Sequence, residues 1–181
     1  MRSFIAIELD DYTKNLLNGV QLKLKQHGIK GNYSRPENFH LTLKFLGDID
    51  LPVFNEVVHI IKKVAFSNQF FVLKLSGLGI FNRGSKMIIW SGLEKSNRLL
   101  KVYSELQTEL ENLLPNIDKR EYMPHITLVR EVKYSGETVD FISGVALDHQ
   151  FEVAGISLME STRINGKLTY IRRAFEPFKP N

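Results

Sequence analysis

Two segments of this sequence repeat one pattern, in which a histidine stands two positions before a threonine and a leucine follows. The first segment is FHLTLKFLG, which contains His40 and Thr42, and the second is PHITLVR, which contains His125 and Thr127. Side chains two positions apart on a β-strand lie on the same face of the sheet, about 7 Å apart along the strand. Each segment, if it forms a strand, therefore presents an imidazole and a hydroxyl side by side on a rigid support.

Two imidazoles and two hydroxyls on one surface suit proton transfer at a phosphate. Histidine has an ordinary pKa near neutral pH, so one imidazole can act as a base while the other acts as an acid. Threonine hydroxyls can donate hydrogen bonds to phosphate oxygens, where negative charge develops in the transition state. The residues therefore predict in-line attack on a phosphodiester by water or a substrate hydroxyl. One histidine would activate the attacking group and the other would protonate the leaving oxygen, with no metal ion and no cofactor.

Only two of the five histidines carry this pattern. His27, His59 and His149 are followed by other residues, and we expect them at helix ends or on the surface. The alternative for His40 and His125 is a half-buried strand histidine that hydrogen-bonds its own threonine. One isolated motif would favour that alternative, whereas two motifs, each inside a strand pattern, favour a shared site.

The composition is that of a globular protein of 181 residues, with 43% hydrophobic residues, 24% charged residues and a formal net charge of +4. This mild basic excess favours anionic partners such as nucleotides or RNA. The chain has no cysteine, which excludes a disulfide scaffold, a thiolate zinc site and a cysteine nucleophile. The start, MRSFIAIELDD, does not resemble a signal peptide, and no stretch reaches the roughly 20 apolar residues of a membrane span. We expect a cytoplasmic monomer without membrane contact.

Hydrophobic periodicity places helices between strands along the whole chain. Helices are expected after the acids Asp10 and Asp11, after Asp50 and after Ser96, with a shorter helix within residues 136–147. The expected strands lie at residues 3–9, 39–46, 70–75, 87–90, 125–132, 151–160 and 168–178. Helices packed on mostly antiparallel sheet define an α+β fold, and we expect residues 1–181 to form a single domain.

The paired motifs resemble those of the two-histidine (HxTx) phosphoesterase superfamily. Further segments, RSFIAIEL, RPENFHLTLKFLGDI, LKLSGLGIF and LTYIRRAFEPF, are similar to the RNA 2′,3′-cyclic phosphodiesterase branch, historically called 2′-5′ RNA ligases. The resemblance extends over nearly the whole chain. It implies a bilobal fold, in which two antiparallel β-sheet lobes with flanking helices are related by a pseudo-twofold, with an active-site cleft between them.

The resemblance also implies hydrolysis of a terminal 2′,3′-cyclic phosphate to a 2′-phosphomonoester. His40 would be the proton donor and His125 the proton acceptor, a distinction that the spacing of the two motifs does not make. The partners would be RNA ends or 2′,3′-cyclic nucleotides. Some members of the branch also join RNA ends through a 2′-5′ bond, so reverse 2′-5′ RNA ligase activity is a further expectation.

Thr42 and Thr127 are the expected phosphate-binding residues, and Arg130 is a third candidate because a guanidinium can hold a phosphate through two hydrogen bonds. Arg130 matches an arginine that is common at this place in the family. Strict alternation nevertheless puts Arg130 on the face opposite His125, so it needs a bulge or strand end at about position 129 to turn inward. A surface salt bridge is the alternative role for this residue.

Two further residues are possible substrate contacts. Alternation puts Lys44 on the face of His40, where it could attract the RNA backbone or simply be solvated. Tyr170 matches a position near the cleft of the family, and an aromatic ring there could stack on a terminal base. Phe4 matches a similar position, but we expect it in the core.

Two other functions are compatible with the sequence. A non-catalytic RNA-binding module would use a basic cleft, and its affinity would fall steeply with salt. Intact motifs in both halves argue against this function, because binding alone needs neither imidazole. A related cyclic phosphodiesterase would keep the chemistry and act on another small nucleotide, such as a cyclic phosphate of the ADP-ribose type or a 2′-5′ oligoadenylate.

Overall fold

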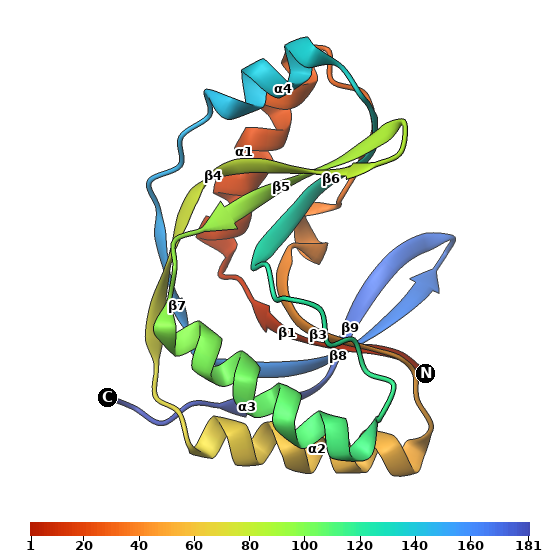
Figure 1. Cartoon of the computed structure of the whole chain (residues 1–181), viewed down its shortest axis with the longest axis vertical. Coiled ribbons are helices and arrows are strands. Elements are labelled where there is room, and N and C mark those ends of the chain that lie inside the picture. Colours follow the sequence, from red (N-terminus) through yellow and green to blue (C-terminus); the bar gives the residue numbers. More distant parts are fainter.

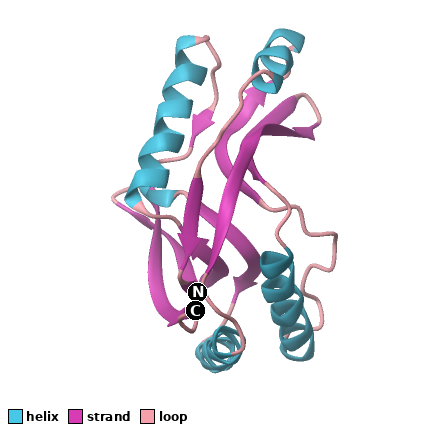
Figure 2. Ribbon diagram, turned by 90° about the vertical axis from the view of Figure 1, so that its left-hand side faces the viewer, coloured by secondary structure: helices cyan, strands magenta, loops and turns pink.

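The computed structural model describes all 181 residues and contains two antiparallel β-sheets with helices on their outer sides (Figures 1 and 2). The first sheet has the strand order β3-β1-β8-β9, and the second has the order β2-β6-β5-β4-β7. Their bounds are β1 (Arg2–Glu8), β2 (Asn32–Tyr33), β3 (His40–Asp48), β4 (Phe71–Arg83), β5 (Lys86–Leu93), β6 (His125–Lys133), β7 (Gln150–Val153), β8 (Gly155–Ile164) and β9 (Lys167–Pro177). The two strands that carry the histidine motifs, β3 and β6, therefore belong to different sheets.

Each of the four α-helices begins at a polar capping residue. Asp10, Asp50, Ser96 and Ser135 accept a hydrogen bond from the backbone N–H three residues further on. The first three helix starts agree with the sequence prediction, whereas the last helix stops before Gly144 and is shorter than predicted. None of the helices has the length and apolar character that crossing a bilayer requires. Their bounds are α1 (Asp11–Gln26), α2 (Leu51–Phe66), α3 (Asn97–Leu113) and α4 (Gly136–Ser143).

Two of the helices cross from one sheet to the other. α1 follows β1 of the first sheet but contacts β6 of the second, and α3 follows β5 of the second sheet but contacts β3 of the first. α2 packs on β8, β9 and α3, so α2 and α3 lie at one end of the molecule while α1 and α4 lie at the other (Figure 1). One buried apolar cluster consequently includes residues of both sheets, such as Leu41 of β3 and Ile126 of β6.

The apolar run at residues 151–160, predicted as one strand, forms two strands in different sheets. β7 pairs with β4 in the second sheet, whereas β8 pairs with β1 and β9 in the first. The chain changes sheets at Gly155, where a Cβ atom would lie 2.4 Å from the carbonyl oxygen of Glu176 in β9. Only glycine allows the backbone of β8 to come this close to β9 as it enters the first sheet.

A buried glutamine fixes α1 to the second sheet. Gln21 is 1% exposed, and its Nε2 donates hydrogen bonds to the carbonyl oxygens of Ser34 and Leu128, each at 2.8 Å. The carbonyl of Leu128 in β6 also accepts a hydrogen bond from the backbone N–H of Ser34, at 2.9 Å. One side chain therefore satisfies carbonyl groups of two segments that α1 covers.

Replacing Gln21 with leucine should destabilise the fold, because both carbonyl groups would lose a donor in a buried place. We expect the free energy of unfolding, measured by urea denaturation, to fall by about 1–3 kcal/mol. Gln26→Leu is the matched control, because Gln26 is exposed on the same helix. It should change the free energy of unfolding by less than about 0.5 kcal/mol. Equal effects of the two substitutions would contradict a stabilising role for Gln21.

Candidate active site

His40 is the first residue of β3, and both nitrogens of its ring have a partner. Nδ1 lies 2.7 Å from the carbonyl oxygen of Asn38, and Nε2 lies 2.9 Å from the hydroxyl oxygen of Thr42. Because a carbonyl only accepts, Nδ1 carries the hydrogen, and Nε2 of the neutral ring is the acceptor. The ring packs against Phe4, with the centroids 4.8 Å apart, and against the edge of Tyr170, at 5.0 Å. Nε2 is therefore the nitrogen available for proton transfer.

His125, the first residue of β6, is held in the same way. Its Nδ1 lies 2.7 Å from the carbonyl oxygen of Met123, which again is two residues earlier in the chain. Phe81 meets the ring edge-on with a centroid distance of 4.8 Å, and Trp90 lies at 6.1 Å. Both histidines thus present Nε2, and each ring lies against a pair of aromatic side chains. Unlike Nε2 of His40, Nε2 of His125 has no hydrogen-bond partner in the protein.

Phe81 and Trp90 were not among the predicted site residues. Trp90 pairs with Thr127 of β6, so the two side chains share a face, and it also pairs with Gly79 of β4. A Cβ atom at position 79 would lie 2.1 Å from Cη2 of the indole, so the ring needs a glycine beneath it. Alternation in the β4–β5 hairpin puts Trp90 and Ile88 on one face. Only the pairing with β6 shows that this face is the one that carries His125.

A bulge in β3 reverses the predicted direction of Lys44. In the pairing of β1 with β3, Ala6 lies opposite Thr42 and Ile5 lies opposite Lys44. Leu43 is therefore an extra residue of β3 without an opposite partner. Adjacent residues of β1 point to opposite faces, and Lys44 therefore points away from the face of Thr42.

The prediction that Lys44 shares the face of His40 is consequently wrong. Lys44 is only 5% exposed, and its Nζ donates to the hydroxyl of Tyr103 at 2.7 Å and to the carbonyl oxygen of Asp118 at 2.6 Å. This lysine is bound inside the protein and is not placed to contact a substrate beside His40.

The same bulge occurs in β6, and it turns Arg130 toward the face of His125. In the pairing of β5 with β6, Trp90 lies opposite Thr127, and the residue before Trp90 lies opposite Val129. The residue of β6 between Thr127 and Val129 therefore has no opposite partner. Val129 is fully buried, and the next side chain, that of Arg130, is exposed on the other face. The bulge that Arg130 requires to turn toward the face of His125, as expected from the sequence, is therefore present. None of the ion pairs of the structure includes Arg130.

The two motif strands lie next to each other although they belong to different sheets. β3 contacts β6, and the hydroxyl of Tyr122, just before β6, donates to the carbonyl oxygen of Thr42 at 3.0 Å. The positive charge of Arg130 acts on both His40 and His125, and a charge on His125 acts on His40. Because β3 contacts β6 and these effects have one direction, we group the two imidazoles and the guanidinium as one candidate cluster.

Burial and positive charge keep both histidines neutral near pH 7. Burial is the largest cause that lowers the pKa of His40 to about 4; its hydrogen bond to Asn38 opposes this effect, and Arg130 and His125 reinforce it. Burial also lowers the pKa of His125, opposed by the hydrogen bond to Met123 and reinforced by Arg130. A bound anion would raise both pKa values, because it stabilises the protonated rings. The cluster is therefore suited to an anionic ligand.

The other predicted residues complete this surface. Thr127 is partly buried beside Trp90. Tyr170 lies edge-on to Phe4, with the centroids 4.9 Å apart, and burial raises the pKa of its hydroxyl. Phe4 is 3% exposed, which confirms its predicted place in the core, but its ring also supports His40.

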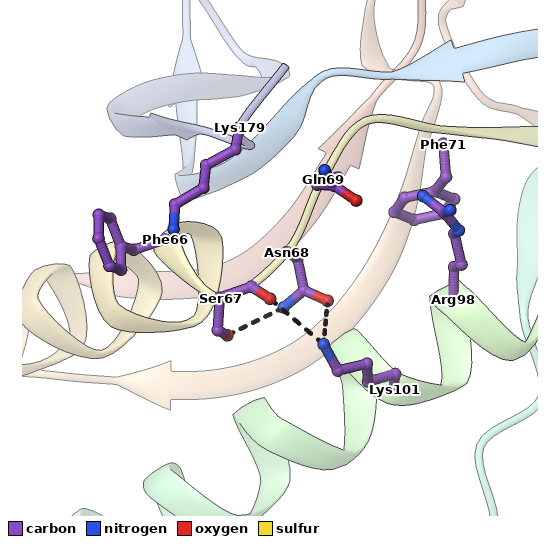
Figure 3. A pocket seen from close by; sticks show the side chains of 8 residues that line it. All are labelled: Phe66, Ser67, Asn68, Gln69, Phe71, Arg98, Lys101 and Lys179. Atoms are coloured by element: carbon purple, nitrogen blue, oxygen red, sulfur yellow. Dashed lines mark hydrogen bonds between the residues drawn. The ribbon is translucent and has the colours of Figure 1, made fainter. Parts of the chain in front are cut away.

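A cavity of about 430 Å³ lies elsewhere, between the end of α2 and the start of α3 (Figure 3). Its cations already have protein partners. Arg98 donates to a backbone carbonyl at 3.1 Å, Lys101 donates to Asn68 Oδ1 at 3.3 Å, and the ammonium group of Lys179 lies 3.6 Å from the ring centroid of Phe66. Neither motif contributes to this cavity, so the chemistry-bearing residues identify the surface of β3 and β6 as the candidate active site.

Comparison with known proteins finds relatives that cover most of this chain. A family model described as LigT-like phosphoesterase matches residues 7–90. The RNA 2′,3′-cyclic phosphodiesterase of Thermotoga maritima is 36% identical over 137 residues, which cover 74% of this chain and 71% of that protein. Among solved structures, TT0787 of Thermus thermophilus has a TM-score of 0.84 at 23% identity, covering 99% of both chains. LigT of E. coli in its apo form has a TM-score of 0.83 at 20% identity, covering 98% of this chain and 97% of its own. These structures confirm the predicted α+β fold.

Replacing Arg130 with glutamine should raise the pKa of both His40 and His125, because it removes a positive charge that disfavours their protonation. The measurement is a pH titration of the imidazole NMR signals, in which His40 of the wild type should titrate at about 4. Arg98→Gln on α3 is the control, and it should leave both pKa values unchanged. If Arg130→Gln also leaves them unchanged, the guanidinium does not belong to the cluster.

Proposed function

The chain belongs to the LigT-like phosphoesterase family, and we propose on that basis that it is an RNA 2′,3′-cyclic phosphodiesterase. It would hydrolyse a terminal 2′,3′-cyclic phosphate to a 2′-phosphomonoester. The observation that carries the proposal is the matched pair of imidazoles on β3 and β6, each with Nδ1 bonded to the carbonyl two residues earlier and Nε2 left to react. Two such groups can supply the base and the acid that displacement at phosphorus needs.

The cyclic phosphate would lie between the Nε2 atoms of His40 and His125. The hydroxyls of Thr42 and Thr127 would donate hydrogen bonds to its non-bridging oxygens, on which charge increases during the reaction. Arg130, turned to this face by the bulge, would add a guanidinium that neutralises that charge. Binding the anion would also raise the pKa of each histidine and so allow the site to take up a proton with the substrate.

The reaction would be an in-line displacement by water. The water oxygen attacks phosphorus opposite the 3′ oxygen, and Nε2 of His125 accepts the proton that water loses. The bond from phosphorus to the 3′ oxygen breaks, and protonated His40 donates a proton from Nε2 to that oxygen. The phosphate stays on the 2′ oxygen, and both histidines recover their starting state by proton exchange with solvent.

The surroundings of the two rings support these roles. Nε2 of His125 has no protein partner, so a water molecule can approach it as a base. Burial lowers the pKa of His40 to about 4 in the free protein, so this ring would take up the proton that it donates when the anionic substrate binds. The hydroxyl of Thr42 donates to the neutral His40 ring and would turn to the phosphate when that ring is protonated, which leaves Nε2–H free to face the leaving oxygen.

The proposal extends to substrate range and assembly. RNA ends or 2′,3′-cyclic nucleotides would be the substrates of a cytoplasmic monomer, whose residues 1–181 form a single bilobal domain. The exposed part of Tyr170 would offer a ring edge to a terminal base. The same groups acting in reverse would join a 2′-phosphate end to a hydroxyl, which is 2′-5′ RNA ligation. The reaction would need no metal ion and no cofactor.

Hydrolysis of an oligonucleotide with a terminal 2′,3′-cyclic phosphate, assayed in EDTA, tests the function. We expect the ring to open and the phosphate to remain on the 2′ oxygen. His40→Ala and His125→Ala should each lower kcat/KM by about 10²–10⁴-fold, because each removes one proton-transfer group. His59→Ala is the matched control, because this histidine is exposed on α2 and should be replaceable without loss.

The outcomes separate the rival functions. Activity that survives both active-site substitutions would remove the two-histidine mechanism, and activity lost in EDTA but restored by a divalent ion would remove metal independence. Salt-sensitive RNA binding without turnover would indicate a non-catalytic RNA-binding module. Faster opening of another cyclic nucleotide than of the RNA end would indicate a different substrate for the same chemistry.

A further inference from the structure

Lys44 is a buried cation at a position where the other motif strand has a valine. Lys44 directly follows the bulge residue of β3, and Val129 directly follows the bulge residue of β6. Lys44 is 5% exposed and Val129 is 0% exposed. Removing an ammonium group from water costs free energy, whereas burying valine is favourable. Val129 shows that an apolar side chain fits the bulge, so folding of the strand does not by itself require the charge of Lys44.

The partners of Lys44 are neutral groups from outside its own sheet. Nζ donates to the hydroxyl of Tyr103 on α3 and to the backbone carbonyl of Asp118, and it lies 4.6 Å from the ring centroid of Tyr103. The carboxylate of Asp118 points to a different partner, Arg120, at 2.6 Å. Lys44 therefore binds the backbone at Asp118, and its cost of burial is offset by two short hydrogen bonds and a ring contact.

That backbone belongs to residues 114–124, the segment that links α3 to β6. The segment has a second tie to β3, because the hydroxyl of Tyr122 donates to the carbonyl of Thr42 at 3.0 Å. The ring of Tyr122 also stacks on Tyr103, with the centroids 4.0 Å apart and the planes at 3°. Burial raises the pKa of Tyr122, which keeps its hydroxyl protonated and able to donate. The segment has no helix or strand of its own, so it is held by these contacts and by the burial of Ile117 in the core.

The 114–124 segment directly precedes His125 and includes the carbonyl of Met123 that fixes its ring. We propose that Lys44 is a positioning residue for His125. β3 carries His40 on one face and, through Lys44 on the other, holds the segment that orients the second imidazole. The effect on reaction rate rests on the proposed function, whereas the effect on the segment and on the His125 ring does not.

Lys44→Met tests this inference, because methionine has a similar length and suits an apolar interior but cannot donate to Asp118. We expect kcat for a 2′,3′-cyclic phosphate substrate to fall by about 10²-fold with little change in KM, since the reacting groups would be misplaced while phosphate binding persists. Amide hydrogen exchange in residues 114–124 should become faster, and the pKa of His125 should move toward its ordinary value. Lys62→Met, at an exposed lysine of α2, is the control and should behave like the wild type.

The exchange and titration measurements need no substrate, so they decide the inference even if the wild-type protein hydrolyses nothing. Wild-type exchange and an unchanged His125 pKa in folded Lys44→Met would overturn it. If that variant does not fold, Tyr103→Phe replaces it, because the change removes one acceptor of Lys44 and keeps the stacked ring. Tyr103→Phe should show the same changes more weakly, and wild-type kcat together with wild-type exchange in residues 114–124 would again overturn the inference.

Discussion

One extra residue in each motif strand is the constraint on which the site depends. Up to the threonine, alternation sends the histidine and the hydroxyl to one face, and the residue between them, Leu41 or Ile126, into the core. The bulge at Leu43 and at Leu128 then shifts the alternation by one residue. The next residue is buried in both strands, and the one after it returns to the site face, where β3 has Phe45 and β6 has Arg130. The same local geometry thus gives two equivalent histidines but only one arginine.

The electrostatics of the free protein follow from this asymmetry. Two half-buried imidazoles share their surroundings with one guanidinium, so the neutral state is favoured for both rings. Their tautomer is set by backbone carbonyls, which belong to Asn38 and Met123 and leave Nε2 of each ring without a hydrogen. A surface that is positive and has two neutral bases would attract an anion, and a bound anion would favour protonation of the rings. Substrate charge and proton uptake are therefore linked.

Buried polar side chains bring the two sheets together at this surface. The helices α1 and α3 each follow a strand of one sheet and pack on the other, which couples the two halves of the chain. Gln21 ties α1 to the bulge residue Leu128, and Lys44 ties β3 to the segment before His125. Both contacts end on backbone carbonyls, one within the motif of β6 and one in the segment that leads to it. Groups that would be costly to bury alone thus hold the motif strands in position.

The sequence by itself determined the pairing of histidine with threonine, the α+β class and the helix starts at Asp10, Asp50 and Ser96, because alternation and capping depend on neighbours a few residues away. It did not determine which way Lys44 and Arg130 point. Those directions, like the sheet change at Gly155 and the place of Trp90 beside Thr127, depend on pairing between strands that are distant in the chain. A shift of one residue in that pairing moves a side chain from the core to the surface, and only the tertiary structure sets the register.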